Sequence, residues 1–489
     1  MNERIRRLGI ALCLCYIAVF VMLNRIQVFG AEALNERPEN VDVVRIDFAR
    51  NRGTITTADG TVIAESVPVD DEFEYQRRYP TNDLFAPVTG YYSFEFGTAG
   101  LERSYQDELV GDTAEQQLRG FADLFVGEDQ VGDLRTTLRT DLQTVAREQL
   151  GQRRGAVVAI DPQTGEILAF WDYPSYDPNA LSTHDLEEAR AAREFLQPDS
   201  PDSPLIASSY QDRFFPGSTF KVVVGSSGLK FGVVTPEEPV YPTEASWVPP
   251  QTTRPLNNSH TCGGALFEIL AESCNTSFAR MAVETLGADR TIEGAEAFGF
   301  NDVPPIDLPD PVESNFPIDF TDNTPALAQS AIGQFEVAAS PLQMALVAAA
   351  VANDGVMMAP HVVDELRDGD GDVIETFDEE VWQQPISASD AATMRDAMRG
   401  VVDGGTASSL AGLPYDVGAK TGTAQLGTDP PSSHAWMIAW AGPEGGEPEI
   451  AVAVLVEGIP GQGSEATGNG EAGPIAAAII DTYLGGGGG

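Results

Sequence analysis

Three lysines occur in this chain of 489 residues, and two of them stand in short patterns that could do chemistry. Lys221 follows Ser218 by three positions, whereas Lys420 begins a Lys-Thr-Gly-Thr run and Lys230 has no such setting. A residue type this scarce is not used for surface solubility, so the positions that keep it need an amine. Because a Pro-Gly pair marks a helix start just before Ser218, its hydroxyl and the amine of Lys221 are expected on one helix face.

A serine hydroxyl is a poor nucleophile until a neighbouring base takes its proton. Lys221 can act as that base only when it is neutral, which requires burial or a nearby cation. Lys420 is the natural candidate for the cation. Between the two lysines lies Ser273-Cys-Asn275, in which Ser273 would relay the proton and Asn275 would bind substrate and orient Lys221. Each pattern alone is weak, since Ser-x-x-Lys also occurs at ordinary helix starts.

The Lys-Thr-Gly-Thr run is expected on a strand at a sheet edge. Gly422 has no side chain, so a substrate backbone could lie against this edge as an added strand. Thr421 and Thr423 would offer hydroxyls, and Lys420 a charge, to a terminal carboxylate. The backbone N–H groups of Ser218 and Thr423 could together polarise the carbonyl under attack, as in an oxyanion hole.

The elements that must position these residues begin at Gly155. Apolar runs predict two early strands and three late ones, with helices between them. This pattern indicates a mixed α/β domain whose antiparallel sheet is closed by both ends of the segment, with helices packed around it. The strands are expected at 156–160, 167–171, 417–426, 435–441 and 450–457, and the helices at 185–195, 219–229, 265–286, 341–352 and 472–483.

The chain divides into four predicted parts. Residues 1–30 would form a cytoplasmic stub and membrane anchor, 31–150 a mostly β, non-catalytic pedestal, 151–484 the catalytic domain, and 485–489 a flexible glycine tail. Within the catalytic part, Asp368-Gly-Asp-Gly-Asp372 superficially matches a calcium loop. Its sixth position is Val373 rather than glycine, and its flanks are strand-like, so an acidic hairpin turn is the better interpretation.

The N-terminus predicts the compartment. Arg4, Arg6 and Arg7 precede an uncharged run over 8–23, which a weaker apolar tail extends to residue 29. That length suffices for a single membrane span with the basic side in the cytoplasm, which places the catalytic part outside the cell. Ala31-Glu-Ala33 resembles a signal-peptidase site, so cleavage is the alternative.

Charge and cysteines narrow the class of protein further. The 74 acidic residues against 29 basic ones leave a net charge of −45, which argues against nucleic-acid binding. This charge suits a saline exterior; a GC-rich genome would explain the scarce lysines but not the excess of acid. Cys262 and Cys274 are expected to form a disulfide, the alternative being two buried thiols. Four histidines without ligand spacing beyond His260-Thr-Cys262 make a metal site unpromising.

The ordered set Ser-x-x-Lys, Ser-x-Asn and Lys-Thr-Gly resembles the active-serine motifs of penicillin-binding proteins and β-lactamases. The segments around these motifs resemble class B penicillin-binding proteins over nearly the whole chain, and length and anchor look most similar to the actinobacterial penicillin-binding protein A type. Ala207-Ser-Ser209 departs from the Asn-Arg-Ala common in that family. The similar segments are 155–169, 174–179, 215–222, 331–334, 340–343, 404–407 and 434–436, with Arg52-Gly53 and Gly100-Leu-Glu102 in the pedestal.

The resemblance implies a monofunctional peptidoglycan D,D-transpeptidase that cross-links stem peptides through a Ser218 acyl-enzyme and is acylated by β-lactams. It implies no metal or organic cofactor, and a polytopic membrane glycosyltransferase as partner. The alternatives are a D,D-carboxypeptidase, a β-lactamase or β-lactam sensor, and a non-catalytic scaffold of the cell-wall machinery. Retention of both motif lysines argues against the scaffold.

Overall fold

The computed structural model describes residues 6–7, 12–17, 19–20, 22, 48–113, 116, 131–459 and 466–486. The described residues divide into two compact units, of which the smaller contains Val67–Gln76 and residues 48–51. In it Phe48 and Phe73 pack edge to face, with ring centroids 5.3 Å apart. No helix within the described ranges is both long and apolar enough to cross a bilayer. Much of the predicted anchor over residues 1–30 lies outside those ranges.

The catalytic sheet has five antiparallel strands in the order β15-β16-β17-β7-β8. Two come from the start of the catalytic segment and three from its end, and they meet where β17 pairs with β7. The sheet keeps two open edges, β15 and β8, so it is not closed into a barrel. The strands are β7 (Gly155–Ile160), β8 (Ile167–Tyr173), β15 (Asp416–Gln425), β16 (Ser433–Gly442) and β17 (Ile450–Val456).

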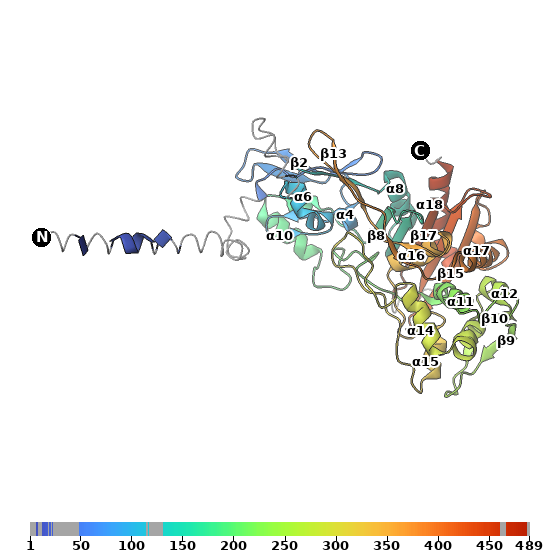
Figure 1. The fold of residues 1–489 in the computed structure, drawn as a ribbon. Coiled ribbons are helices and arrows are strands. Elements are labelled where there is room, and N and C mark those ends of the chain that lie inside the picture. The colour runs from blue at the N-terminus through green and yellow to red at the C-terminus, as the bar shows by residue number, and fades with distance from the viewer. Residues whose placement is uncertain are drawn as a thin grey trace. The chain divides into compact units, whose positions relative to one another are not determined.

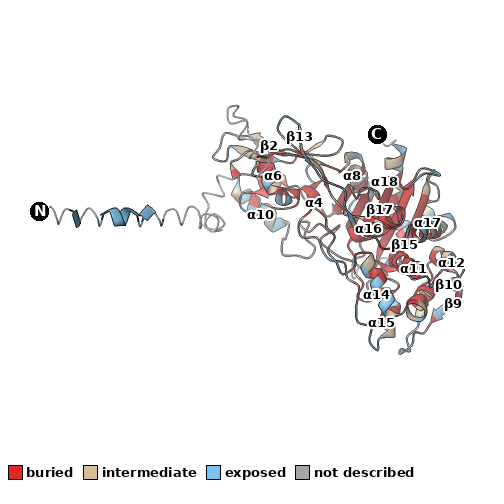
Figure 2. Cartoon of the chain, in the orientation of Figure 1, coloured by how far each residue is buried: buried red, intermediate tan, exposed pale blue. Residues whose placement is uncertain are grey.

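Helices cover both faces of this sheet, because β16 and β17 are buried at every position. One group packs α8 (Thr140–Leu150) against α18 (Gly473–Gly485) and the sheet; the other contains α16 (Pro341–Ala352) and α17 (Ala388–Asp403) (Figure 1). Helix α16 is buried along its whole length, which follows from a sequence that is apolar at every position except Gln343 (Figure 2). Ser340 caps its first turn through the N–H of Gln343.

The remaining helices lie between β8 and α16 in the sequence. They are α9 (Asn179–Ser182), α10 (Leu186–Phe195), α11 (Lys221–Lys230), α12 (Leu266–Ala271), α13 (Asn275–Arg280), α14 (Ala288–Ala297) and α15 (Thr324–Ser330), with a 3₁₀ turn at Gly217–Phe220 and π-type turns at Met281–Leu286 and Gly468–Ala472. A hairpin of β9 (Tyr241–Trp247) and β10 (Leu256–Gly264), which was not predicted, lies beside α13.

The pedestal contains a six-stranded sheet in the order β13-β12-β6-β1-β2-β3. Its first two strands form a hairpin from the catalytic segment, so the pedestal is not built from residues 31–150 alone. The acidic turn that resembled a calcium loop joins this hairpin, as predicted. The strands are β1 (Ile55–Thr56), β2 (Val62–Pro68), β3 (Tyr75–Arg78), β6 (Asp133–Thr136), β12 (Val363–Arg367) and β13 (Val373–Thr376).

The described part of the chain also contains several short elements. They are α4 (Ala86–Thr89), α5 (Leu101–Ser104), α6 (Gln106–Val110), the strand pair β4 (Tyr92–Ser93) and β5 (Gly97–Thr98), the pair β11 (Met357–Met358) and β14 (Val381–Gln383), and a 3₁₀ turn at Ser408–Leu410.

One predicted helix, over residues 265–286, is wrong as a continuous element. Helix α12 ends at Ala271 and α13 begins at Asn275, because Ser273 takes a left-handed backbone conformation with φ of 59°. A non-glycine residue in this region costs energy and is held there by its surroundings. The break falls on the Ser-x-Asn motif, where it turns the chain out of the helix and frees Ser273 and Asn275 to face Lys221.

Candidate active site

Ser218 lies on a tight turn that leads directly into α11. Residues Gly217–Phe220 form a 3₁₀ turn, and the N–H of Lys221 donates to the carbonyl oxygen of Ser218. The backbone thus fixes Ser218 next to the first residue of the helix. Within the described part of the chain the Ser218 hydroxyl itself makes no hydrogen bond, and the side chain is half-buried.

The amine of Lys221 is fully buried and held by the second motif. Its Nζ donates to the carbonyl oxygen of Ser273 at 2.7 Å and to Asn275 Oδ1 at 2.6 Å, and lies 3.2 Å from Ser273 Oγ. Asn275 in turn donates through Nδ2 to the carbonyl oxygen of Asn257 on β10 at 2.9 Å. The predicted contact between Asn275 and Lys221 is therefore present, while the amine makes no hydrogen bond to Ser218 in this state.

Lys420 contacts the same hydroxyl from the third motif. Its Nζ donates to Ser273 Oγ and to the carbonyl oxygen of Thr421, both at 2.9 Å. Ser273 Oγ consequently lies between the amines of Lys221 and Lys420, residues that are 199 positions apart in the sequence. The three motifs meet at this oxygen.

The environment favours the neutral form of both amines. Burial, and after it the nearby charge of Lys420, holds the pKa of Lys221 well below the ordinary lysine value. Burial also lowers the pKa of Lys420 to about 7. Desolvation therefore contributes more than the lysine–lysine repulsion on which the sequence argument relied.

His434 lies on β16, the strand next to β15. Burial lowers the pKa of His434 to about 4, and its Nδ1 accepts a hydrogen bond from the N–H of Gly458 at 3.1 Å. His434 is thus a neutral residue on β16, paired in register with Ala424 of β15.

Close packing explains why residue 422 has no side chain, which could not be inferred from the sequence. A Cβ at this position would lie 2.8 Å from the carbonyl oxygen of Pro216 and 2.9 Å from Cβ of Trp436. Strand β15 therefore packs against the turn that carries Ser218, so glycine is required for this close approach. Gly217 faces the same strand, because a Cβ there would lie 3.0 Å from the carbonyl oxygen of Thr423.

Further hydrogen bonds hold the turn that carries Ser218. Gly217 N–H donates to Gly333 O, and Trp436 Nε1 donates to Phe215 O, both at 3.0 Å. Thr219 Oγ1 donates to the carbonyl oxygen of Pro216 at 2.8 Å. These bonds secure the segment on both sides of Ser218.

Sequence reasoning assigned no role to Thr406. Its hydroxyl bonds that of Thr421 at 2.8 Å, and its N–H donates to the carbonyl oxygen of Ala271 at 3.2 Å. Thr406 thus connects the third motif to the end of α12, directly before the second motif. The Gly404-Gly-Thr-Ala407 segment was singled out by resemblance, but no local spacing indicates this bridge.

A disulfide joins Cys262 at the end of β10 to Cys274. It ties the chain on one side of Ser273 to the neighbouring hairpin, and both cysteines are buried. The unusual Ala207-Ser-Ser209 segment contributes Ser209, whose N–H and hydroxyl donate to buried Asp172 at 2.6 and 2.7 Å. Burial raises the pKa of Asp172 to about 7.

Comparisons with known proteins agree with this geometry. Residues 155–481 match the family described as penicillin binding protein transpeptidase domain, and residues 52–134 match the penicillin binding protein A dimerisation domain. The peptidoglycan D,D-transpeptidase PbpA of Mycolicibacterium smegmatis is 38% identical over 499 residues, covering 99% of both chains. PbpA of Mycobacterium tuberculosis is 36% identical over 500 residues with the same coverage.

Solved structures are similar as well. Penicillin-binding protein A from M. tuberculosis, in its penicillin G acyl-enzyme complex, has a TM-score of 0.80 at 36% identity, covering 89% of this chain and all of the other. A D,D-transpeptidase domain from Eggerthella lenta has a TM-score of 0.76 at 30% identity, covering 90% of this chain and 99% of the other. With its three motifs converging on one serine hydroxyl, the chain belongs to the penicillin-binding protein transpeptidase family, of the penicillin-binding protein A type.

Proposed function

We infer that this protein is a peptidoglycan D,D-transpeptidase which cross-links stem peptides and is acylated by β-lactams. The observation that carries the inference is the meeting of Lys221 and Lys420 at Ser273 Oγ, beside the turn that presents Ser218. A scaffold protein would have no need of two buried amines, whose desolvation costs free energy.

The reaction has two halves. Ser218 Oγ bonds to the carbonyl carbon of the penultimate D-Ala, and the C–N bond to the terminal D-Ala breaks. The hydroxyl proton passes to the leaving amine, with Lys221 as base and Ser273 as relay. The amine of a second stem peptide then attacks the ester, forms the cross-link and returns a proton to Ser218.

Substrate recognition is assigned to the open edge of the sheet. Strand β15 is an edge strand, and Thr423 on it is exposed, so an extended donor peptide can pair with it. Thr421, Thr423 and Lys420 would bind the terminal carboxylate. The N–H groups of Ser218 and Thr423 would stabilise the oxyanion, since Gly217 and the Thr423 carbonyl are in close contact.

The direct test is labelling of the purified chain with a fluorescent penicillin. Wild type is expected to carry one covalent label that peptide mapping places on Ser218, and Ser218→Ala is expected to carry none. Ser208→Ala, a serine outside the three motifs, is the matched control and should be labelled normally. A label on another residue, or undiminished labelling of Ser218→Ala, would refute the assignment.

A second assay separates transfer from hydrolysis. The chain is given a donor peptide ending in D-Ala-D-Ala, with and without an amine acceptor, and products are resolved by mass spectrometry. We expect cross-linked product with release of D-Ala when the acceptor is present. If hydrolysed donor is the sole product at saturating acceptor, the chain is a D,D-carboxypeptidase; rapid turnover of penicillin would indicate a β-lactamase.

We also propose that residues 8–29 anchor the chain in the cell membrane, with the catalytic domain outside and a membrane glycosyltransferase as partner. The three arginines before this segment and the disulfide in the exported part support the topology. Protease treatment of intact cells should digest the catalytic domain, and the chain should stay in membranes washed with carbonate. Release by carbonate would contradict the anchor.

A further inference from the structure

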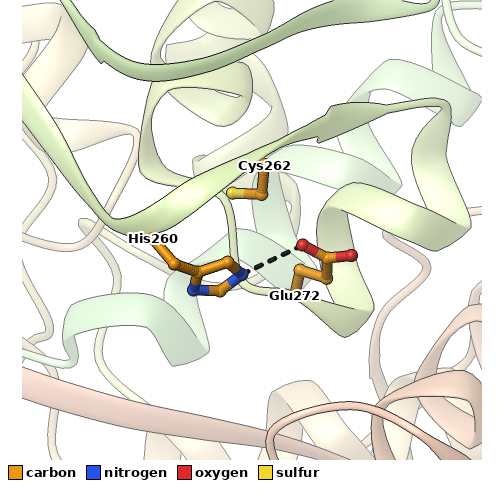
Figure 3. Close-up of side chains that lie close together, drawn as sticks. All are labelled: His260, Cys262 and Glu272. Atoms are coloured by element: carbon orange, nitrogen blue, oxygen red, sulfur yellow. Dashed lines mark hydrogen bonds and ion pairs between the residues drawn. The ribbon is translucent and has the colours of Figure 1, made fainter.

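The two cysteines of the disulfide, together with a neighbouring histidine and glutamate, form a cluster of four side chains with metal-binding atoms. His260 and Cys262 stand two positions apart on β10, while Glu272 and Cys274 stand two apart in the turn between α12 and α13. Figure 3 shows that His260 and Glu272 face each other next to Cys262. The catalytic mechanism uses none of the four.

The donor atoms are already close. The ligand atoms of His260, Cys262 and Glu272 all lie within 4.8 Å of one another, and His260 Nε2 lies 3.0 Å from Glu272 Oε2. The two cysteine Cα atoms are 5.9 Å apart. In a tetrahedral zinc site with bonds of 2.0–2.3 Å, donors are about 3.3–3.8 Å from one another. Small side-chain rotations would reach this spacing.

The imidazole is oriented as a ligand would be. Ser259 Oγ lies 3.0 Å from His260 Nδ1, which leaves Nε2 directed at Glu272. Metal-bound histidines are commonly held in this manner, by a hydrogen bond to the ring nitrogen that does not bind the metal. The His260 and Glu272 side chains are 51% and 48% exposed, so an ion can enter from solvent.

With the disulfide intact, the cluster is a hydrogen-bonded His260–Glu272 pair beside a disulfide rather than a metal site. Cysteine binds metal as a thiolate, and the sulfur of Cys262 is bonded to that of Cys274. Reduction adds two electrons and two protons to the disulfide and yields two thiols, while a thiol reductant is oxidised to its disulfide, or a phosphine to its oxide with oxygen from water. Two sulfur ligands then join the nitrogen and oxygen ligands.

We propose that the dithiol form of this protein binds one zinc-class divalent ion through His260, Cys262, Glu272 and Cys274. Binding displaces the two thiol protons to solvent. Two-electron oxidation of the pair by a disulfide oxidant, which is itself reduced to thiols, forms the disulfide again and releases the metal. Two thiolates with one imidazole select zinc-class ions over calcium or magnesium, which prefer oxygen ligands. Because Ser273 lies between two of the ligands, metal binding and the geometry of the second catalytic motif are coupled.

The test uses the full chain in detergent, with Cys13→Ser and Cys15→Ser to remove its other thiols. The protein is reduced with a phosphine, which binds these metals weakly, and titrated with Co²⁺ under inert gas. We expect one Co²⁺ per chain, with thiolate-to-cobalt absorption in the near ultraviolet and the visible bands of tetrahedral cobalt. Added Zn²⁺ should displace it, and the oxidised chain should show neither signal.

Variants separate the site from nonspecific thiol binding. His260→Ala and Glu272→Ala keep both thiols and are expected to weaken Co²⁺ binding at least tenfold. Glu293→Ala, an exposed carboxylate on α14, is the matched control and should bind as wild type does. Penicillin labelling of each oxidised variant verifies that it has folded. Octahedral cobalt bands, equal binding by the oxidised chain, or unchanged affinity in both ligand variants would overturn the proposal.

Discussion

At the scale of single residues, the buried amine of Lys221 has a pKa well below the ordinary lysine value. Two causes act on Lys221, burial first and the charge of Lys420 second. Because the pKa of Lys420 is itself about 7, that charge is present mainly below neutral pH. The two lysines therefore form a coupled pair whose balance changes within the physiological range.

Lys420→Ala is expected to move the pH profile of acylation to higher pH. Removing a positive neighbour raises the pKa of Lys221, so less of it is neutral at a given pH. The decrease in acylation rate relative to wild type should be largest below pH 7. It should become smaller above pH 7, where wild-type Lys420 has also lost its charge. The measurement is the second-order rate constant for a fluorescent penicillin between pH 5 and pH 9, with rates taken at about one-unit intervals.

Lys420→Arg provides the control for this prediction. An arginine stays charged, so it should restore the position of the profile while recovering less of the rate, because its planar fork differs in geometry. An unshifted profile in Lys420→Ala would mean that burial alone keeps Lys221 neutral.

Lys221→Ala should abolish acylation at every pH and leave some substrate binding.

At the scale of elements, the turn that carries Ser218 and strand β15 act as one unit. Gly422→Ala is expected to lower the acylation rate by about 10²-fold, since a Cβ displaces the turn and a displacement near 1 Å has that effect. Gly412→Ala is the matched control, because nothing lies within 4 Å of a Cβ there. Equal acylation by the two variants would show that the close packing is not needed.

Most of these elements could be predicted from the sequence, but the pairing of β12 with β6 could not. Helix α16 was placed to the residue because its apolar run is local, and strand β15 was placed within one residue at each end. The hairpin of β12 and β13 joins β6, which lies about 230 positions earlier. Pairing over such a separation leaves no local pattern, so its membership of the pedestal sheet was missed.

In the candidate site, too, local patterns could be predicted from the sequence and long-range contacts could not. The lysine motifs could be found because their residue types and spacing carry the chemistry. Thr406 could not, since its bridge to Thr421 and Ala271 depends on tertiary contacts alone. The helix break at Ser273 was missed because the flanking residues keep a helical pattern, whereas hydrogen bonds from two lysines hold the motif outside a helix.

At the scale of the whole molecule, a buried ion triad supports the pedestal. Arg52 and Arg77 both bond Glu102, at 2.8 and 2.6 Å, and all three side chains are at most 1% exposed. Burial alone raises the pKa of Glu102, but Arg77 and Arg52 outweigh it and hold the pKa below its ordinary value. The carboxylate therefore stabilises the fold above its unfolded pKa, and this contribution is lost as pH falls through the folded value.

Glu102→Gln is expected to lower the free energy of unfolding by about 3–5 kcal/mol, because two buried guanidinium groups lose their counter-charge. Asp310→Asn removes the partner of Arg103 in a pair that is 53% and 65% exposed, so it should change stability by less than about 1 kcal/mol. Thermal unfolding followed by tryptophan fluorescence compares the two. A Glu102→Gln melting temperature equal to that of Asp310→Asn would contradict the role of the triad.

The net charge of −45 predicts a further property of the whole chain. Added salt screens repulsion between carboxylates over a Debye length of about 10 Å at 0.1 M. The melting temperature should therefore rise between low and molar NaCl. A flat or falling melting temperature would remove the link between acidity and a saline habitat.

The packing of Gly422 against the Ser218 turn also bears on antibiotic resistance. A drug-excluding side chain at Gly422 would push on the carbonyl of Pro216 and so displace Ser218, the proposed nucleophile. Bacteria that depend on this enzyme would grow more slowly with such a mutation. Selection under penicillin is therefore expected to preserve Gly422 and to enrich substitutions elsewhere around the substrate edge.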